Sequence, residues 1–182
     1  MVAFTCNDKH GTPFLAVSYH GDTAGLVTPP VVKMVSEAQK ASHPDATLLF
    51  GMDANAYSHK HPKKLFIDDF VSGSAALGLH TCWGDDAAAM PTSVMNARTF
   101  CQTQLNKAIR RADFVPENKA IDCNPKDHFL YDPLQVQCSE AKIDNTGTGS
   151  VSVDVHDPTV IMPGMTFPSD HAIVTCTVET LP

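Results

Sequence analysis

The chain has 182 residues, 43% of them hydrophobic and 18% charged, which is typical of one globular domain with a substantial core. Its formal net charge of −7 argues against a protein that coats nucleic acid with a uniformly basic surface. No stretch approaches the roughly 20 continuous apolar residues of a membrane span. We therefore expect a single domain over residues 1–182 and no membrane span.

The start of the chain, "MVAFTCNDKHG", lacks the basic region and long apolar core of a signal peptide, which slightly favours an intracellular location. The six cysteines form no CxxC pair and no zinc-finger spacing. Their simplest interpretation is as small buried apolar residues. Disulfides stay open, because spacing does not give their connectivity.

The pattern of apolar residues predicts two helices, over residues 29–43 and 63–79. Short apolar runs bounded by polar residues or glycine predict strands at 12–21, 46–56, 80–84, 98–105, 127–132, 133–143 and 171–179. The segment before Phe14 is expected to hold a turn at "CNDKHG" and no strand of the sheet core. This mixture, without a repeat or a linker, predicts one α/β domain.

Several predicted strands carry an acid, an amide or an imidazole at one boundary. Loop ends at the edge of a sheet commonly hold catalytic groups, because the sheet fixes them rigidly. Together these groups offer carboxylates for a hard cation, an amide for a phosphate oxygen and imidazoles for acid–base work, which suits phosphodiester hydrolysis. The residues are His20, Asp53, Asn55, Asp127, Asp170 and His171.

These residues also have simpler interpretations. Asp53 and Asn55 are two apart and would point the same way in an extended segment, but both types favour turns by bonding their own backbone. Asp127 could cap a strand or pair with Lys126. His20 could be a satisfied core histidine.

Three further residues are candidates for substrate contact. Trp83 could stack on a base or a sugar, although a lone tryptophan is more often partly buried in the core. Arg98 and Gln102 lie in the basic run "RTFCQTQLNKAIRR", which is either a solvated face or an edge that meets phosphate. The histidines of "SHKHPKK" do not complete a zinc site, so we expect an exposed loop there.

Four segments, taken in order, resemble motifs of the endonuclease/exonuclease/phosphatase superfamily, the metal-dependent group that contains DNase I-like nucleases, deadenylases and inositol-polyphosphate phosphatases. "GMDANA" resembles its Gly-Asp-x-Asn strand end with Met52 inserted, and "SDHAIV" resembles its closing Ser-Asp-His motif. "KDHFLY" resembles the aspartate and strand before that motif, and "VSYHGD" the earlier strand that ends in histidine. No single motif is specific, but four in order are.

The resemblance, which runs from about Phe14 to Val178, implies a four-layer αββα fold, a two-sheet β-sandwich flanked by helices. It implies cleavage of a P–O bond that depends on Mg²⁺ or Mn²⁺, with nucleic acid or a small phosphate ester as the substrate. Asp170 would ligate the metal. His171, oriented by Asp127, would be the general base or electrostatic partner at the attacked phosphorus.

The resemblance also assigns roles at the neighbouring strands. Asp53 would position or help deprotonate the attacking water, and Asn55 would hold a phosphate oxygen. His20 would stabilise the transition state from the other side of the phosphate.

The chain departs from the superfamily at its beginning. The family starts with a strand that carries an asparagine and a second that carries the glutamate serving as its main metal ligand. Only thirteen residues precede Phe14, with no glutamate among them, and Asn7 lies in the turn-like "CNDKHG". We therefore expect the C-terminal two thirds of the family domain, incomplete at its N-terminus.

Three functions stay open from the sequence. The first is a divalent-metal-dependent nuclease or phosphodiesterase, and its rival within the family is a phosphoinositide or sugar-phosphate phosphatase. The third is a catalytically inactive binding module, because the glutamate is missing.

Overall fold

The structure is a computed structural model, and it describes residues 1–87, 93–94, 123–144 and 171–181. The chain divides into two compact units. The first is formed by Met1–Met90, Pro125–Ala141 and Cys176–Pro182, and the second by Pro91–Asn124 and Lys142–Thr175. The strand predicted at 98–105 lies outside the described residues, and the single domain over 1–182 stays a prediction.

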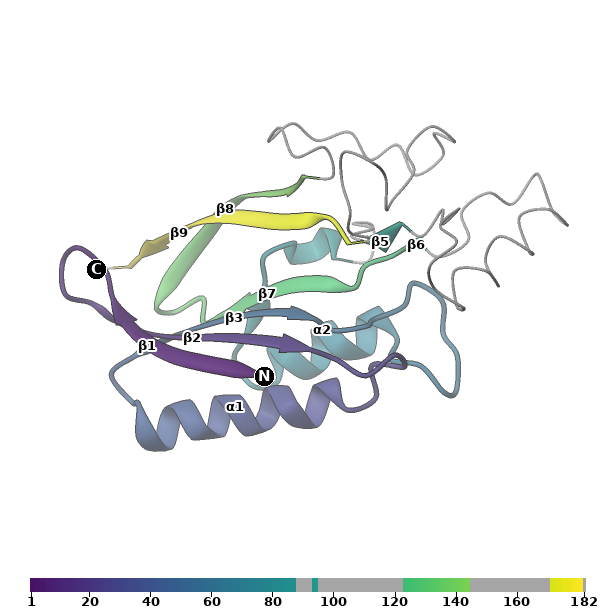
Figure 1. Cartoon of the computed structure of the whole chain (residues 1–182), viewed down its shortest axis with the longest axis horizontal. Coiled ribbons are helices and arrows are strands. Elements are labelled where there is room, and N and C mark those ends of the chain that lie inside the picture. Colours follow the sequence, from purple (N-terminus) through teal and green to yellow (C-terminus); the bar gives the residue numbers. More distant parts are fainter. Residues whose placement is uncertain (88–92, 95–122, 145–170, 182) are drawn as a thin grey trace, which may run out of the picture. The chain divides into compact units, whose positions relative to one another are not determined.

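A five-stranded mixed sheet forms the centre of the first unit (Figure 1). Strands β2 and β3 run parallel, whereas every other neighbouring pair in this sheet is antiparallel. A parallel pair needs a crossover connection, and helix α1 (Thr28–Ser42) supplies it. In spatial order the strands are β1 (Val2–Asn7), β2 (Pro13–His20), β3 (Thr47–Asp53), β7 (Asp127–Tyr131) and β4 (His80–Thr81).

Helices α1 and α2 (Ile67–Ala75) lie on the same side of this sheet (Figure 1). Both predicted helices are confirmed, but α2 is shorter than residues 63–79 at each end. At its start, the backbone at Phe66 is extended and forms a bridge with Tyr57. Beyond its end, Gly78 has a φ of +82°, which helical residues do not adopt.

The central strands bury one face against the helices. Leu48, Phe50 and Met52 alternate along β3 and are almost fully buried. Because successive side chains of a strand point to opposite faces, the next residue, Asp53, belongs to the other face. The apolar packing of β3 therefore fixes the direction in which Asp53 projects.

The first residues of the chain correct an expectation. Val2–Asn7 form strand β1, which pairs antiparallel with β2 from Val2↔Ser18 to Asn7↔Pro13. All six residues are exposed, so the strand has no buried face that would give it an alternating apolar pattern. The sequence is therefore a weak signal for this strand, which is held by its pairing with β2. The turn itself is present, since the Asp8 carboxylate accepts hydrogen bonds from two backbone amides just after the strand.

The remaining elements confirm the predicted α/β class and add two small sheets to the five-stranded one. Strands β8 (Val136–Asp144) and β9 (Ile173–Thr180) pair in a two-stranded sheet, and β5 (Ser93–Val94) pairs with β6 (Cys123–Asn124). The strand predicted at 80–84 is short and gives way to a 3₁₀ turn, η1 (Gly84–Asp86). Within the described ranges, no helix has the length and apolar character needed to cross a membrane.

Candidate functional site

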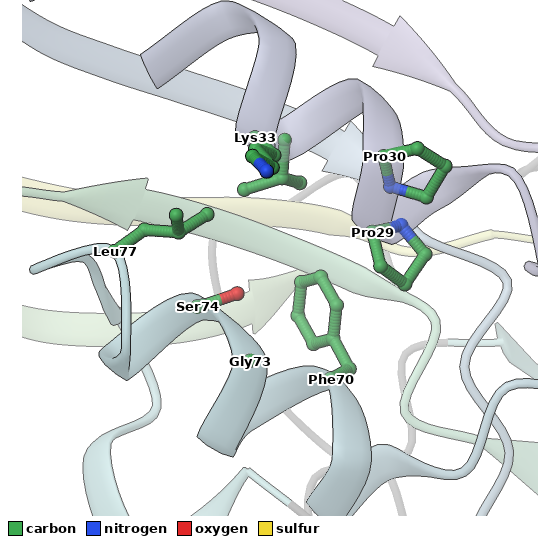
Figure 2. Close-up of a pocket in the computed structure, with 8 residues that line it drawn as sticks. Pro29, Pro30, Lys33, Phe70, Gly73, Ser74 and Leu77 are labelled. Atoms are coloured by element: carbon green, nitrogen blue, oxygen red, sulfur yellow. The ribbon is translucent and has the colours of Figure 1, made fainter. Parts of the chain in front are cut away.

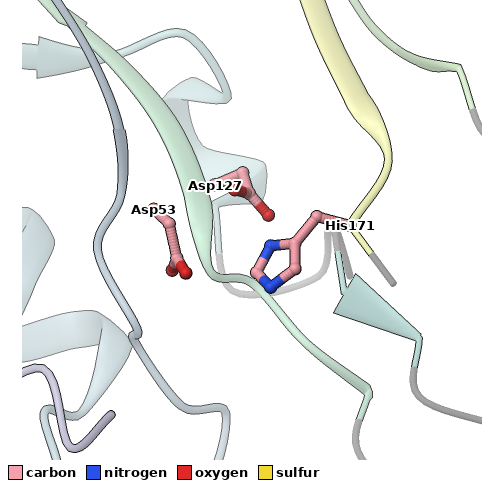
Figure 3. Close-up of side chains that lie close together, drawn as sticks. All are labelled: Asp53, Asp127 and His171. Carbon is pink, nitrogen blue, oxygen red and sulfur yellow. The ribbon is translucent and has the colours of Figure 1, made fainter. Parts of the chain in front are cut away.

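A row of three polar residues crosses the sheet where β2 and β3 end and β7 begins. His20 lies directly opposite Asp53, and Asp53 directly opposite Asp127. Directly opposed residues on neighbouring strands share one face, so the three side chains project from the same face of the sheet. A carboxylate oxygen of Asp53 and one of Asp127 lie within 4.8 Å of each other (Figure 3).

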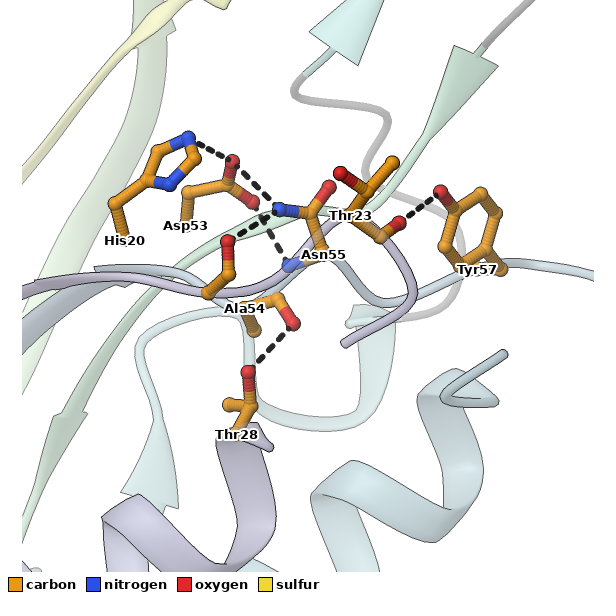
Figure 4. Close-up of polar contacts among 8 residues, drawn as sticks. His20, Thr23, Thr28, Asp53, Ala54, Asn55 and Tyr57 are labelled. Atoms are coloured by element: carbon orange, nitrogen blue, oxygen red, sulfur yellow. Dashed lines mark hydrogen bonds and ion pairs between the residues drawn. The ribbon is translucent and has the colours of Figure 1, made fainter. Parts of the chain in front are cut away.

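His20 and Asp53 form the second contact of the row. The Nε2 atom of His20 lies 3.4 Å from Oδ2 of Asp53, and the imidazole is 81% exposed (Figure 4). The interpretation of His20 as a core histidine is therefore wrong. An exposed ring at the rim of a buried carboxylate is accessible to an incoming anion.

Asn55 orients the carboxylate of Asp53. The backbone N–H of Asn55 donates to Oδ1 at 2.8 Å, and its side-chain Nδ2 donates to Oδ2 at 3.1 Å (Figure 4). Nδ2 also donates to the carbonyl of Gly21 at 3.2 Å. Asn55 has a φ of +49°, so the expected extended segment is wrong and the turn interpretation describes the backbone correctly. The turn nevertheless brings both side chains together.

The backbone of this turn is anchored on both sides. The amide of Gly21 donates to the Asp53 carbonyl at 2.8 Å, the Thr28 hydroxyl to the Ala54 carbonyl at 3.0 Å, and the Ala54 amide to the Lys126 carbonyl at 2.6 Å. A Cβ on Gly21 would lie 2.7 Å from Oγ1 of Thr28 and 3.0 Å from the Asp53 carbonyl. Only glycine lets the two strand ends approach so closely.

Tyr57 is a further residue near the row that belongs to none of the sequence motifs, and Lys126 is one that the sequence offered only as a partner of Asp127. The Tyr57 hydroxyl donates to the Thr23 carbonyl at 2.7 Å. The Lys126 ammonium lies 5.4 Å from the centroid of the Tyr57 ring, and Lys126 is only 6% exposed. The sequence signal was the lysine next to the aspartate, but its burial depends on Tyr57, far along the chain.

Trp83 has a positioning role in the structure. It is 6% exposed, and its Nε1 donates to the backbone carbonyl of Asp127 at 2.9 Å. This burial agrees with the core interpretation, and the substrate contact given to Trp83 stays a prediction. The indole fixes the strand that carries Asp127.

His128, although adjacent to Asp127, is not part of the row. It is 2% exposed and packs against Phe70 on the helix side, with ring centroids 4.8 Å apart. Its Nε2 lies 2.8 Å from the Pro125 carbonyl and its Nδ1 3.0 Å from the Thr81 hydroxyl. A carbonyl only accepts, so Nε2 carries the hydrogen. Burial lowers the pKa of His128 to about 4, and the ring is neutral at physiological pH.

The remaining predicted residues fall into two groups. His171 is half-buried and belongs to the second unit. It lies directly before the buried Ala172 and strand β9. Asp170, Arg98 and Gln102 lie outside the described residues. The roles given to these four stay predictions. The two histidines of "SHKHPKK" lie in an exposed loop, as expected.

An apolar pocket of about 260 Å³ lies between α1 and α2 (Figure 2). Its lining includes the rings of Pro29, Pro30 and Phe70 and the side chain of Leu77. It holds no carboxylate or imidazole and faces the helices, so it is separate from the row of His20, Asp53 and Asp127.

Comparison with solved structures identifies the fold. The catalytic domain of human Nocturnin, solved with a sulfate anion, has a TM-score of 0.51 and 15% identity. The endonuclease domain of TRAS1, a telomere-specific non-LTR retrotransposon, has a TM-score of 0.55 and 14% identity, and D. rerio TDP2 with a single-strand DNA product 0.54 and 11%. Each match covers 98% of this chain. The chain has a DNase I-like fold.

The chain is similar to these proteins in its structure. No protein-family model matches the chain, and no curated protein sequence does. The chain spans 52–63% of the length of these three structures. The absence of the fold's first strands stays a prediction.

Proposed function

We propose that this protein is a divalent-metal-dependent phosphoesterase that cleaves P–O bonds as a nuclease or phosphodiesterase. The observation that carries the proposal is the row of His20, Asp53 and Asp127 at one edge of a DNase I-like sheet. Two of the similar structures are an endonuclease domain and a protein bound to a single-strand DNA product, which favours nucleic acid as the substrate class.

The electrostatics of the carboxylate pair support a cation. Like charges directly opposite each other on neighbouring strands are destabilising. Asp53 and Asp127 nevertheless place oxygens within 4.8 Å of each other. A hard divalent ion with oxygen ligands offsets this repulsion, and Mg²⁺ or Mn²⁺ fits such a donor set.

We further propose that the carboxylate of Asp170 ligates the cation and that His171 is the general base or electrostatic partner. The support for both roles is the Ser-Asp-His sequence directly before β9. A cation at this place would neutralise charge that develops on the phosphoryl oxygens.

The residues of the row have distinct tasks in this proposal. Asp53, held by two hydrogen bonds from Asn55, orients the attacking water and accepts its proton or passes it on. His20 is exposed and, when protonated, donates to a phosphate oxygen from the rim. His171 acts as the general base or stabilises the charge at phosphorus.

A cleavage assay tests the proposal. The purified chain is incubated with a bis-aryl phosphodiester, a supercoiled plasmid and a short RNA, each with Mg²⁺, with Mn²⁺ and with EDTA. Wild-type protein should cleave at least one substrate only when a cation is present. Asp53→Asn, Asp127→Asn and His171→Ala should each lower the rate by about 100-fold or more.

Asp85→Asn is the matched control, because Asp85 is an exposed aspartate of η1 that is not part of the row. It should leave the rate unchanged. Cleavage of inositol or sugar phosphate monoesters alone would favour the phosphatase alternative. Folded wild-type protein that binds the cation but hydrolyses none of these substrates would instead indicate a binding module.

A further inference from the structure

Two cysteines lie on the two paired strands of the two-stranded sheet. Cys138 lies on β8 and Cys176 on β9, and both are half-buried. The two strands are tied nearby by a hydrogen bond from the Leu181 amide to the Gln135 carbonyl at 2.9 Å. A second bond joins the Thr177 hydroxyl to Oε2 of Glu140 at 3.1 Å. The pairing of the strands therefore holds both cysteines in place.

The thiols of Cys138 and Cys176 are close enough that each affects the pKa of the other. A third cysteine, Cys82, lies close enough to influence the charge of Cys138, and its backbone amide donates to the Phe129 carbonyl at 2.8 Å. All three belong to the first unit. Cys138 and Cys176 lie on strands that pair with each other, and both thiols are reduced in this structure.

We propose that Cys138 and Cys176 are a redox modification site and form a reversible disulfide that cross-links β9 to β8. The oxidant is a low-molecular-weight disulfide such as oxidised glutathione. One cysteine thiolate attacks it, releases one thiol and forms a mixed disulfide, and the second cysteine then displaces the other thiol. The protein loses two protons and two electrons, and the small disulfide becomes two thiols.

The chemistry of the thiols agrees with a slow but stable disulfide. Burial raises the pKa of Cys138 to about 12 and that of Cys82 to about 11, and burial also raises the pKa of Cys176. Protonated thiols attack slowly, because the thiolate is the nucleophile. The reduced protein is not stabilised by thiolate formation, because both thiols stay protonated. The equilibrium therefore favours the disulfide.

The cross-link would act on the strand that follows His171. It closes the chain between Cys138 and Cys176 into a loop that contains His171. Such a loop restricts the unfolded chain and stabilises the folded state, so oxidation should raise Tm by about 5 °C or more. Reduction would release the start of β9.

Peptide mapping of the full chain tests the pair directly. Trypsin cuts after lysine and arginine, so each of the six cysteines falls in its own peptide. The protein is equilibrated in reduced and oxidised glutathione, alkylated and digested without reduction. We expect residues 127–142 linked to residues 143–182 in the oxidised buffer, and both peptides alkylated after dithiothreitol.

Three outcomes would overturn the proposal. They are alkylation of both thiols at equilibrium in oxidised glutathione, glutathione adducts without a cross-link, and a cross-link to the peptide that contains Cys82. In a second measurement, oxidation should raise the Tm of the wild-type protein and of Cys82→Ser, but not of Cys138→Ser or Cys176→Ser. An equal rise in all four proteins would also contradict the pair.

Discussion

Asn55 donates two hydrogen bonds to the carboxylate of Asp53, one from its backbone at 2.8 Å and one from its side chain at 3.1 Å. Two donors from one residue fix both carboxylate oxygens, so the aspartate enters any reaction already oriented. The cost is a backbone φ of +49° at Asn55, which asparagine tolerates better than most residues. The identity of residue 55 therefore serves both the hydrogen bonds and the backbone.

Replacing Asn55 separates these two contributions. Asn55→Ala loses the side-chain hydrogen bonds and strains the backbone, and should lower the free energy of unfolding by about 2–3 kcal/mol. Asn55→Gly relieves the strain and should cost less. Both variants should lower kcat more than they change KM, as measured by steady-state kinetics and urea unfolding. An Asn55→Gly variant with wild-type kcat would show that the side-chain amide of Asn55 does not position Asp53.

Gly21 should not tolerate a side chain. A Cβ there would meet Oγ1 of Thr28 at 2.7 Å, so Gly21→Ala should reduce the free energy of unfolding by about 1–3 kcal/mol. Gly73, inside α2, is the control because nothing lies within 4 Å of its added Cβ. Gly73→Ala should stabilise the protein by up to about 1 kcal/mol. Urea unfolding of both variants measures the contrast, and equal effects would contradict the close approach at Gly21.

Trp83→Phe keeps an aromatic ring in the core but removes the donor to the Asp127 carbonyl. The free energy of unfolding should fall by about 1 kcal/mol. Because the lost bond holds the strand that carries Asp127, the Mg²⁺ concentration needed for half-maximal activity should rise. An unchanged Mg²⁺ dependence in Trp83→Phe would mean that the indole only fills space.

His128 should make stability depend on pH. Its folded-state pKa of about 4 is below the ordinary value of 6.5, since burial disfavours the charged ring despite the Pro125 carbonyl and the nearby Asp127 charge. As pH falls below about 6.5, the unfolded chain takes up a proton that the folded ring refuses, so stability present above this pH is lost progressively towards pH 4. The full loss from this group is about 3 kcal/mol.

The measurement is urea unfolding between pH 7 and pH 4 in EDTA, which keeps cations away from the neighbouring carboxylates. His128→Gln should flatten the pH dependence, whereas His43→Gln, at an exposed position, should not. An equally steep fall in His128→Gln would show that other groups govern acid unfolding.

The central strands and both helices could be predicted because their patterns are local. Leu48, Phe50 and Met52 alternate before Asp53, and this alternation both marks β3 and sets the face of the aspartate. Strand β1 could not be predicted so directly, because it buries neither face and owes its existence to pairing with β2.

The acidic and imidazole side chains of the candidate site could be predicted from the sequence. The residues that hold them in place could not. His20, Asp53 and Asp127 stand at recognisable strand ends, and the register places them in one row. The indole of Trp83 and the buried ammonium of Lys126 act through contacts with residues distant in the chain, which a single sequence does not encode locally.

A Mn²⁺ titration of the full chain tests most directly whether Asp53 and Asp127 form a cation site. Binding is measured by electron paramagnetic resonance, as the loss of the signal of the free ion. Wild-type protein and Asp85→Asn should bind one ion with the same affinity. Asp53→Asn and Asp127→Asn should each weaken binding by about tenfold or more, because each removes one charged ligand. Equal Mn²⁺ affinity in all four proteins, or no binding by the folded wild type, would contradict the site.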